Sequence, residues 1–558
     1  MQAIQKALLV ARTLRYLKPI QIWGQLRNRL PRKLPVQPEE WAVAVPDCEW
    51  QSAISKHRGY GGGSSFSFLN VESVISLQGP WWESKNGNLW NYNLNYFEWL
   101  NQGEKLISGQ EASQLISQWI DSNPPGSSRA WDPYPVSLRI INWIRFFLEN
   151  GAVESAHESL AYQAKWLSSR LEIHLLGNHY LVNGVALIFA GLYFTGEDAK
   201  ECLRIGWEVV RDELDAEVLD DGGHFERSPM YHSLILEDVL NLLNLSNTFL
   251  GRAPEGMKQL CEQRASSMLL WLRKMTYKDD SFPLFNDSAV GIAASYGDLS
   301  AYAEKLSIKV RGFKSVRGIE YLSDSRFARI ENKDVLIFAE IGGPGPSHQP
   351  GHAHAGTLGF ELMLKEHRVL VDTGTNSYDV GAKRDYLRST QAHNTLVVEG
   401  QSSSETWSSF RVGRRAIGNC LYFERDKTAP VQTLSAQHDG YVRLGLGGVH
   451  QRTWALSDDS LKITDVIRDL EGKKRVAIRF HFHPEVEIFR RDGAWIAECD
   501  QLQIRVTEQQ GFQYFLDSYE YLAQFGCSTY GKCLVAHATT TEVDVTHELR
   551  WSDNPTLI

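Results

Sequence analysis

The sequence predicts a multi-domain α+β protein, with a helical toroid or solenoid in its N-terminal half and an antiparallel β-sandwich in its C-terminal half. Two changes of pattern support this. Between about residues 110 and 310 apolar residues recur at three-and-four spacing, whereas after about residue 315 short Val, Ile, Leu and Phe runs are broken by Gly, Asn and Asp. A chain of 558 residues is also too long for one hydrophobic core.

Residues 1–58 form the first predicted segment, a basic helical arm. Eight Lys and Arg residues lie between Lys6 and Lys33, and no acidic residue precedes Glu39. Arg12 interrupts the apolar stretch too early for a signal-peptide core, and no segment approaches 18 uninterrupted apolar residues. We therefore expect a cytoplasmic protein or one peripheral to the inner membrane. Its arm either contacts an anionic membrane surface or packs as a solvated helix on its own domain.

Residues 59–315 form the predicted helical domain. It opens on GYGGGSSFS, a Gly/Ser-rich stretch that is typical of a flexible loop. Helical spacing then recurs over residues 137–150, 178–194, 232–250 and 266–277. Repeated helices of this length favour a toroid or solenoid over a four-helix bundle.

Residues 316–558 form the predicted sandwich. Runs such as DVLIFAEIGG, HRVLVDTGT and KRVAIRFHFH are short, apolar and separated by turn residues, without helices between them. The domain boundary is expected near residues 310–320.

The overall charge and the cysteines exclude several classes of protein. A net charge of -9 gives no general attraction to nucleic acid, so an acidic polymer would need a local basic groove. The seven cysteines are odd in number and contain no CxxC pair, which argues against a disulfide framework and against a thiolate zinc site.

Histidines cluster just after the predicted boundary, in HQPGHAHAGTLGFELML. His352 and His354 are two residues apart before a predicted strand, so in an extended segment their side chains point the same way. Asp372 and His393 lie beside strands of the same domain, and two imidazoles with one carboxylate suit a zinc site. The alternative is that these histidines cap strands or bond to backbone carbonyls.

A second polar cluster lies in the helical half. Asn178 and His179 open a predicted helix, where free backbone N–H groups favour an anion. Tyr231 follows a Gly/Pro-broken loop next to Arg227, and a tyrosine there is either a proton carrier or a structural hydrogen-bonding group. Aromatic residues are abundant in this half of the chain, and they either line a groove that binds a glycan or pack in the core. They are Trp81, Trp82, Trp90, Tyr92, Tyr96, Trp131 and Tyr134.

Three segments resemble the heparinase II/III family of polysaccharide lyases. They are NHYLVNG, FERSPMYH, and the ordered series GHAHAGTLGFEL, LVDTGT, YLRSTQAHNTLVVEGQ and FRVGRRA. The resemblance implies an α/α toroid followed by an antiparallel β-sandwich, with the active site in the cleft between them. One departure is the pair Gly356 and Gly359, where many relatives carry an acidic residue and a serine.

The resemblance also implies roles for individual residues. Asn178 and His179 would bind the carboxylate of a uronic acid, and Tyr231 and His352 would transfer protons. His354, Asp372 and His393 would hold a structural zinc ion. Substrate contacts are expected from Arg388 in the YLRST motif, and in addition from Arg227, Trp90, Trp131 and Tyr134.

The implied reaction is β-elimination on an acidic polysaccharide, in which the C5 proton of a uronate is removed and the oxygen at C4 leaves. Without an export signal, a role in making or remodelling a surface polysaccharide is expected in preference to extracellular breakdown. Two alternatives remain open: a uronate C5-epimerase that uses the same site, and a non-catalytic protein that binds or assembles glycans on a lyase scaffold.

Overall fold

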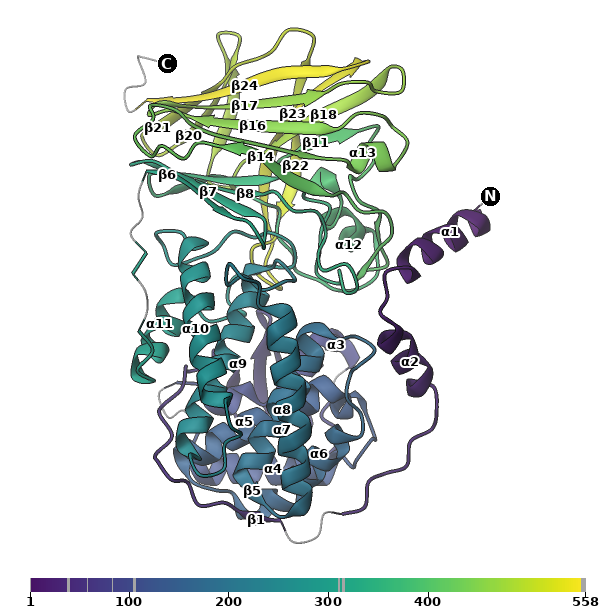
Figure 1. Ribbon diagram of the computed structural model, residues 1–558, viewed down its shortest axis with the longest axis vertical. Coiled ribbons are helices and arrows are strands. Elements are labelled where there is room, and N and C mark those ends of the chain that lie inside the picture. Colours follow the sequence, from purple (N-terminus) through teal and green to yellow (C-terminus); the bar gives the residue numbers. More distant parts are fainter. Residues whose placement is uncertain are drawn as a thin grey trace.

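The computed structural model describes residues 2–37, 41–57, 59–82, 84–103, 107–309, 312–313 and 317–552. Two bodies are stacked along the long axis, with the helices at one end and the sheets at the other (Figure 1). This arrangement confirms the predicted order of a toroid and a sandwich.

The helical body is built around α7, which is buried on nearly all sides. Its two neighbours α5 and α8 pack along it, and Pro residues begin α5 and α9, where the missing N–H costs no helical hydrogen bond. The helices are α3 (Gly87–Tyr96), α4 (Gly109–Ser122), α5 (Pro133–Asn150), α6 (His157–Ser168), α7 (Gly177–Tyr193), α8 (Glu197–Glu217), α9 (Pro229–Thr248), α10 (Met257–Lys274) and α11 (Tyr296–Lys305).

The Gly/Ser-rich stretch is not the flexible loop that its composition predicts. It forms a small antiparallel sheet of β2 (Tyr60–Gly62), β3 (Ser65–Phe68) and β4 (Val71–Val74). The buried ring of Phe66 lies 5.8 Å from that of Trp81 and 5.2 Å from that of Trp99. The free energy gained by burying the Phe66 ring thus outweighs the conformational entropy that the neighbouring glycines lose when they become ordered.

The sheet body consists of antiparallel strands in three main sheets. Their orders are β10-β9-β8-β7-β6, β11-β18-β23-β22 and β14-β15-β16-β17-β24-β21-β20-β19. The strands are β6 (Gly318–Leu322), β7 (Phe327–Glu331), β8 (Val335–Glu340), β9 (Phe360–Leu364), β10 (His367–Leu370), β11 (Leu396–Val398), β14 (Gly418–Phe423), β15 (Gln432–His438), β16 (His450–Leu456), β17 (Ser460–Ile467), β18 (Lys474–His481), β19 (Glu487–Arg491), β20 (Ala494–Cys499), β21 (Leu502–Val506), β22 (Gln513–Tyr521), β23 (Thr529–Thr540) and β24 (Val543–Ser552).

The hydrophobic core of the toroid extends onto the five-stranded sheet and so joins the two bodies, although the sandwich also has a separate core of its own. Phe327 and Met363 of the five-stranded sheet belong to the same buried cluster as Trp271 of α10. The rings of Trp271 and Phe327 lie 6.0 Å apart. The predicted boundary at residues 315/316 falls outside the described residues; α11 ends at Lys305 and β6 begins at Gly318.

The N-terminal arm is helical only in its first half, as α1 (Gln2–Leu14) and α2 (Pro19–Asn28). Farther along, β1 (Ala42–Val43) pairs with β5 (Phe194–Thr195) and so ties the chain to the toroid. Within the part of the chain that the structure describes, no helix combines the length and apolar character needed to cross a bilayer.

Candidate active site

A cleft of about 990 Å³ lies between the toroid and the sandwich. Asn178, His179 and Tyr231 enter it from the toroid, and His352 enters it from the sandwich. The chain segments that carry them are far apart in sequence, so only the packing of the two bodies brings them together. Tyr92, Tyr96, Tyr378 and Phe410 add aromatic surface to the cleft wall.

His179 stands at the first turn of α7 as a candidate anion-binding group. Its Nδ1 lies 3.2 Å from Oε1 of the buried Glu172, and its ring lies 4.3 Å from that of Tyr134. Burial alone would lower the pKa of this histidine, but the charge and hydrogen bond of Glu172 outweigh burial and raise it. The raised pKa favours the protonated form of this imidazole, and that form would attract an acidic ligand.

Asn178 links the toroid to His352 of the sandwich. Its Nδ2 donates to Oε2 of Glu226 at 2.9 Å and lies 3.4 Å from Nε2 of His352, whereas its buried Oδ1 has no hydrogen-bond partner. The preceding Gly177 has φ +61°, and a Cβ there would meet Glu226 Oε1 at 2.8 Å. Glycine is therefore required for the amide to reach this position.

Tyr231 and His352 face each other across the domain boundary. Their rings stack with centroids 3.9 Å apart, and the Tyr231 hydroxyl lies 3.2 Å from that of Tyr378. Burial raises the pKa of Tyr231 well above 10, and the neighbouring Tyr378 and the carboxylate of Asp287 raise it further. The phenol is therefore neutral near pH 7 and can donate a proton.

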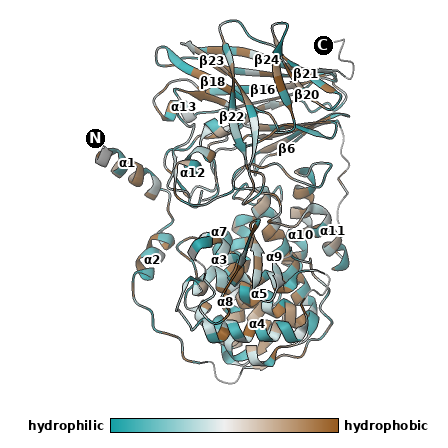
Figure 2. Cartoon of the chain, turned by 180° about the vertical axis from the view of Figure 1, so that it is seen from behind, coloured by the Kyte–Doolittle hydropathy of each residue, from teal (hydrophilic) through white to brown (hydrophobic). Residues whose placement is uncertain are grey.

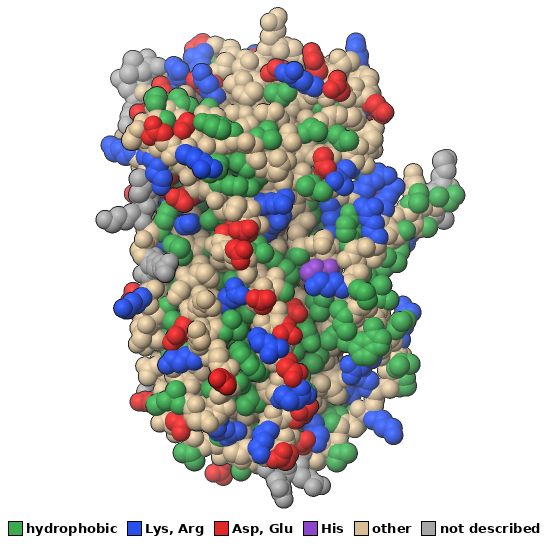
Figure 3. All heavy atoms as spheres, in the orientation of Figure 1, with side chains coloured by type: hydrophobic (Ala, Val, Ile, Leu, Met, Phe, Trp, Pro, Cys, Tyr) green, Lys and Arg blue, Asp and Glu red, His purple; other side chains and the backbone are tan. Residues whose placement is uncertain are grey.

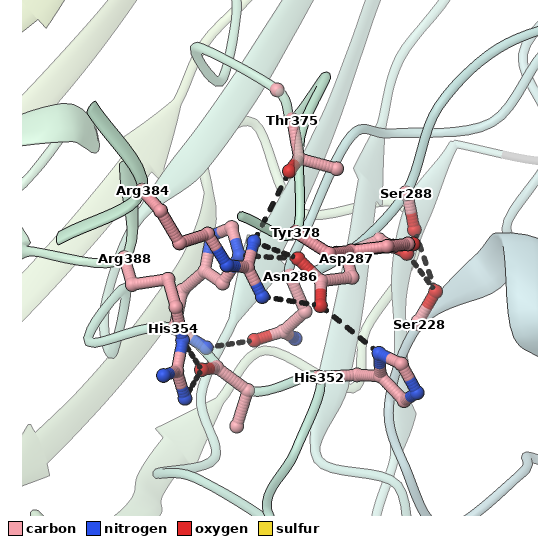
Figure 4. Close-up of polar contacts among 12 residues, drawn as sticks. Ser228, Asn286, Asp287, Ser288, His352, His354, Thr375, Tyr378, Arg384 and Arg388 are labelled. Atoms are coloured by element: carbon pink, nitrogen blue, oxygen red, sulfur yellow. Dashed lines mark hydrogen bonds and ion pairs between the residues drawn. The ribbon is translucent and has the colours of Figure 1, made fainter. Parts of the chain in front are cut away.

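Asp287 is the central residue that sequence reasoning missed. Its Oδ2 lies 2.9 Å from Nδ1 of His352, its Oδ1 lies 2.9 Å from Nε2 of His354, and the Arg384 guanidinium contacts both oxygens (Figure 4). Burial would raise the pKa of this carboxyl, but Arg384 and the histidine hydrogen bonds hold it well below its usual range. An ionised Asp287 only accepts hydrogen bonds, so it requires a proton on His352 Nδ1 and leaves Nε2, which faces the Asn178 amide, as the nitrogen available for proton transfer.

The predicted metal ligands lie behind the cleft, fully buried. His393 Nδ1 is 2.6 Å from Asp372 Oδ2, and the rings of His354 and His393 are 5.5 Å apart. His354 Nδ1 and His393 Nε2 have no hydrogen-bond partner, and a buried nitrogen of this kind is suited to a metal. Among the described residues, however, only His367, Cys499 and Asp500 bring their ligand atoms within 4.8 Å of one another.

The glycine departure in the histidine motif has a local cause. A Cβ at Gly356 would lie 2.8 Å from Oε2 of Glu340 and 3.3 Å from Cγ of His393. The buried Glu340 thus fills the space of a side chain at residue 356. Burial raises the pKa of Glu340 to about 7, against the opposing effect of a hydrogen bond from Asn286.

The predicted substrate contacts separate into two groups. Trp90, Trp131 and Tyr134 line the cleft, as expected, although both tryptophans are largely buried. Arg227 instead donates to the Gly343 carbonyl at 2.6 Å, and Arg388 donates to that of Ala353 at 2.9 Å. Neither arginine lines the cleft. Both guanidinium groups hold loop carbonyls in this structure, so direct contact of either arginine with a substrate stays a prediction.

Comparisons with known proteins agree with this architecture. Residues 83–306 match the heparinase II/III N-terminus and residues 315–543 match the heparinase II/III-like C-terminal domain. A crystal structure of heparinase III superposes with a TM-score of 0.64 at 15% identity, over 83% of this chain and 77% of that chain.

Curated relatives are distant. FtsZ-localized protein C of Caulobacter vibrioides is 23% identical over 72% of this chain and 70% of that protein. A heparin-sulfate lyase of Bacteroides stercoris is 22% identical over 73% of this chain and 62% of that protein. The chain thus spans less than two thirds of the length of that lyase. With both family domains matched in order over most of its length, the chain belongs to the heparinase II/III family.

Proposed function

We propose that this chain is a polysaccharide lyase that cleaves a uronate-containing polysaccharide by β-elimination. The observation that carries the proposal is the meeting of Asn178, His179, Tyr231 and His352 in one cleft. The heparin-sulfate lyase named among the relatives supports the same reaction class.

Recognition of the substrate is assigned to the toroid wall. The cationic form of His179 and the amide of Asn178 would hold the uronate carboxylate, and they would stabilise the negative charge that builds on it when the C5 proton is removed. A well-placed donor of this kind contributes about 3 to 4 kcal/mol to the transition state. The Asn178 amide must turn part of its hydrogen bonding from Glu226 to the substrate.

Proton transfer is assigned to the stacked pair. With its Nδ1 proton held by Asp287, His352 presents an unprotonated Nε2 to the cleft and acts as the base toward C5. Tyr231, neutral because its pKa is raised, gives its hydroxyl proton to the leaving C4 oxygen. After the step His352 carries the C5 proton and Tyr231 lacks one, so transfer of that proton from His352 to Tyr231, directly or through solvent, restores both groups. Tyr378, whose hydroxyl lies 3.2 Å from that of Tyr231, can donate a hydrogen bond to the transient phenolate.

A structural zinc ion is proposed for His354, Asp372 and His393. The two unpaired imidazole nitrogens support it, and the role of a metal there would be to brace the loop that carries His352. Elemental analysis of protein purified without added metal tests this assignment; a chain free of zinc with unchanged melting temperature would remove it.

The decisive test is incubation with heparan sulfate, alginate and capsular uronate polymers in D2O. A rise in ultraviolet absorbance from the 4,5-unsaturated product identifies a lyase. Deuterium at C5 without chain scission identifies the epimerase alternative, which shares the proton abstraction but breaks no bond at C4.

The non-catalytic alternative draws support from the similarity to FtsZ-localized protein C, whose name indicates localisation. It predicts polymer binding without any product, and equal binding by Tyr231→Phe. Peripheral contact of the basic N-terminus with a membrane remains a prediction that the site itself does not address.

A further inference from the structure

The N-terminal arm bridges the two bodies on one side of the cleft. In α1, Arg12 pairs with Glu405 at 2.8 Å, and Thr13 accepts a hydrogen bond from Trp407 of the sandwich at 3.1 Å. In α2, Gln21 donates to the Leu175 carbonyl of the toroid at 3.2 Å. The arm therefore has a defined position, with one side fixed and the other side turned to solvent.

Helix α2 turns its apolar side to solvent, whereas an ordinary surface helix turns that side toward the protein. It buries Gln21 and Gly24 against the protein, and a Cβ at Gly24 would lie 2.9 Å from the His174 nitrogen. On its outer side Ile22, Trp23 and Leu26 are 47%, 52% and 58% exposed. Surface helices normally turn their apolar stripe inward, so this face is built to be covered by something else.

Exposed apolar residues are concentrated on the arm. Of 25 large hydrophobic residues that are exposed among the described residues, ten lie before residue 37. Figure 3 shows hydrophobic side chains gathered over α2 and α1, with Lys and Arg beside them, and Figure 2 shows hydrophobic segments on the projecting α1. The ten are Ile4, Leu8, Leu14, Ile20, Ile22, Trp23, Leu26, Leu30, Leu34 and Val36.

The charge of the arm indicates what binds to its exposed apolar face. The arm has eight Lys and Arg residues and no acidic residue before Glu39, whereas the whole chain has a net charge of -9. A second copy of the arm would repel the first, whereas an anionic lipid surface attracts Lys and Arg while it accepts apolar side chains below its headgroups.

We propose that the arm docks on a bilayer that contains anionic lipids, with Trp23, Leu26 and the apolar side of α1 inserted at the headgroup boundary. Asn28, Leu30 and Arg32, at the end of α2 and just beyond it, line the catalytic cleft. Docking therefore sets one wall of the cleft against the membrane surface, where a polysaccharide held at the membrane can reach it.

Vesicle flotation of the full chain, without polysaccharide, tests the docking separately from any lyase activity. We expect binding to vesicles of phosphatidylcholine with about 30% phosphatidylglycerol, and at least about tenfold weaker binding to phosphatidylcholine alone. The double variant Trp23→Ser with Leu26→Ser should lose at least about tenfold in affinity for the anionic vesicles. The control variant Leu250→Ser removes a 54% exposed leucine just beyond the C-terminal end of α9 and should bind like the wild type.

A second pair of variants separates charge from apolar insertion. Lys6→Gln with Arg29→Gln should weaken binding to the anionic vesicles at least about tenfold, and added salt should reduce wild-type binding in the same way. The proposal is overturned if the wild type fails to float with anionic vesicles, or if the Trp23/Leu26 variant floats as the wild type does. Self-association that this variant abolishes, without vesicle binding by the wild type, would assign the face to a second copy.

Discussion

The two walls of the cleft handle charge in opposite ways. On the toroid wall, His179 keeps a third of its side chain exposed, and one carboxylate, Glu172, raises its pKa. Around His352 of the sandwich wall, Asp287 is fully buried among His352, His354 and Arg384, although the chain carries it between α10 and α11. The toroid thus offers an imidazole whose protonated form can bind an acidic ligand, whereas the buried charges around His352 fix the orientation of one imidazole.

This difference in burial separates the residues proposed to bind the substrate from those proposed to transfer protons. His179, which must exchange water for ligand, stays partly exposed. A base needs a fixed tautomer and a fixed direction, which buried hydrogen bonds provide at the cost of desolvated charges. Substitutions at His352 and at the two residues that contact it, Tyr231 and Asp287, should therefore reduce kcat. Substitutions at His179 and its partner Glu172 should mainly raise KM.

His352→Ala should produce the largest loss, because it removes the proposed base itself. We expect kcat to fall about a thousandfold with little change in KM. Initial rates of ultraviolet absorbance over a range of substrate concentrations measure both. His367→Ala, a half-buried histidine of β10, serves as the control and should keep wild-type rates. A loss of less than tenfold would remove His352 from the proton-transfer step.

Tyr231→Phe should follow, with kcat reduced about a hundredfold. The ring remains stacked on His352, so the variant removes only the hydroxyl that protonates the leaving oxygen. A substrate with a better leaving group at C4 should recover much of the lost rate, while Tyr180→Phe on α7 should change nothing. If the leaving group makes no difference, the acid role belongs to another residue.

Sequence reasoning found the residues that line the cleft, but it did not find the buried residue that orients one of them. Short motifs located Asn178, Tyr231 and His352, because each motif lies within one turn or strand start. Asp287 went unnoticed, since it sits in an ordinary segment, FNDSAV, and acquires its role only when the histidine loop and Arg384 fold over it. The local sequence pattern around Asp287 does not indicate which distant residues it will contact in the fold.

Arg227 and Arg388 show the converse case, in which a local motif predicts a substrate contact and the structure shows a contact with the backbone instead. Both lie within or beside recognisable motifs, and a basic residue near an anion site is readily assigned to the substrate. Their hydrogen bonds to the carbonyls of Gly343 and Ala353 are contacts between distant segments that no spacing rule predicts. The fold order, by contrast, followed from periodicity alone, since helix and strand spacing are local properties.

Asp287→Asn should test the buried network around His352 through stability as well as rate. Loss of the charge leaves Arg384 buried without its partner, which costs about 3 to 5 kcal/mol, and thermal unfolding should show it as a lower Tm. In the folded fraction we expect kcat to fall about thirtyfold, because an amide no longer secures the His352 tautomer. Asp279→Asn, at an exposed carboxylate, is the matched control. An unchanged Tm would contradict the buried ion pair.

Glu172→Gln should give the smallest change and the clearest distinction between the walls. Glu172 raises the pKa of His179, and the cation exists only below that pKa. Without the carboxylate the pKa falls, so near pH 7 less of the histidine is charged and KM should rise about tenfold while kcat is kept. The alkaline limb of kcat/KM should move to lower pH, and activity should return as the pH is lowered. Glu255→Gln, on the surface, should leave the profile in place. A fall in kcat at constant KM would instead assign His179 to the chemical step and abolish the division between a binding wall and a reacting wall.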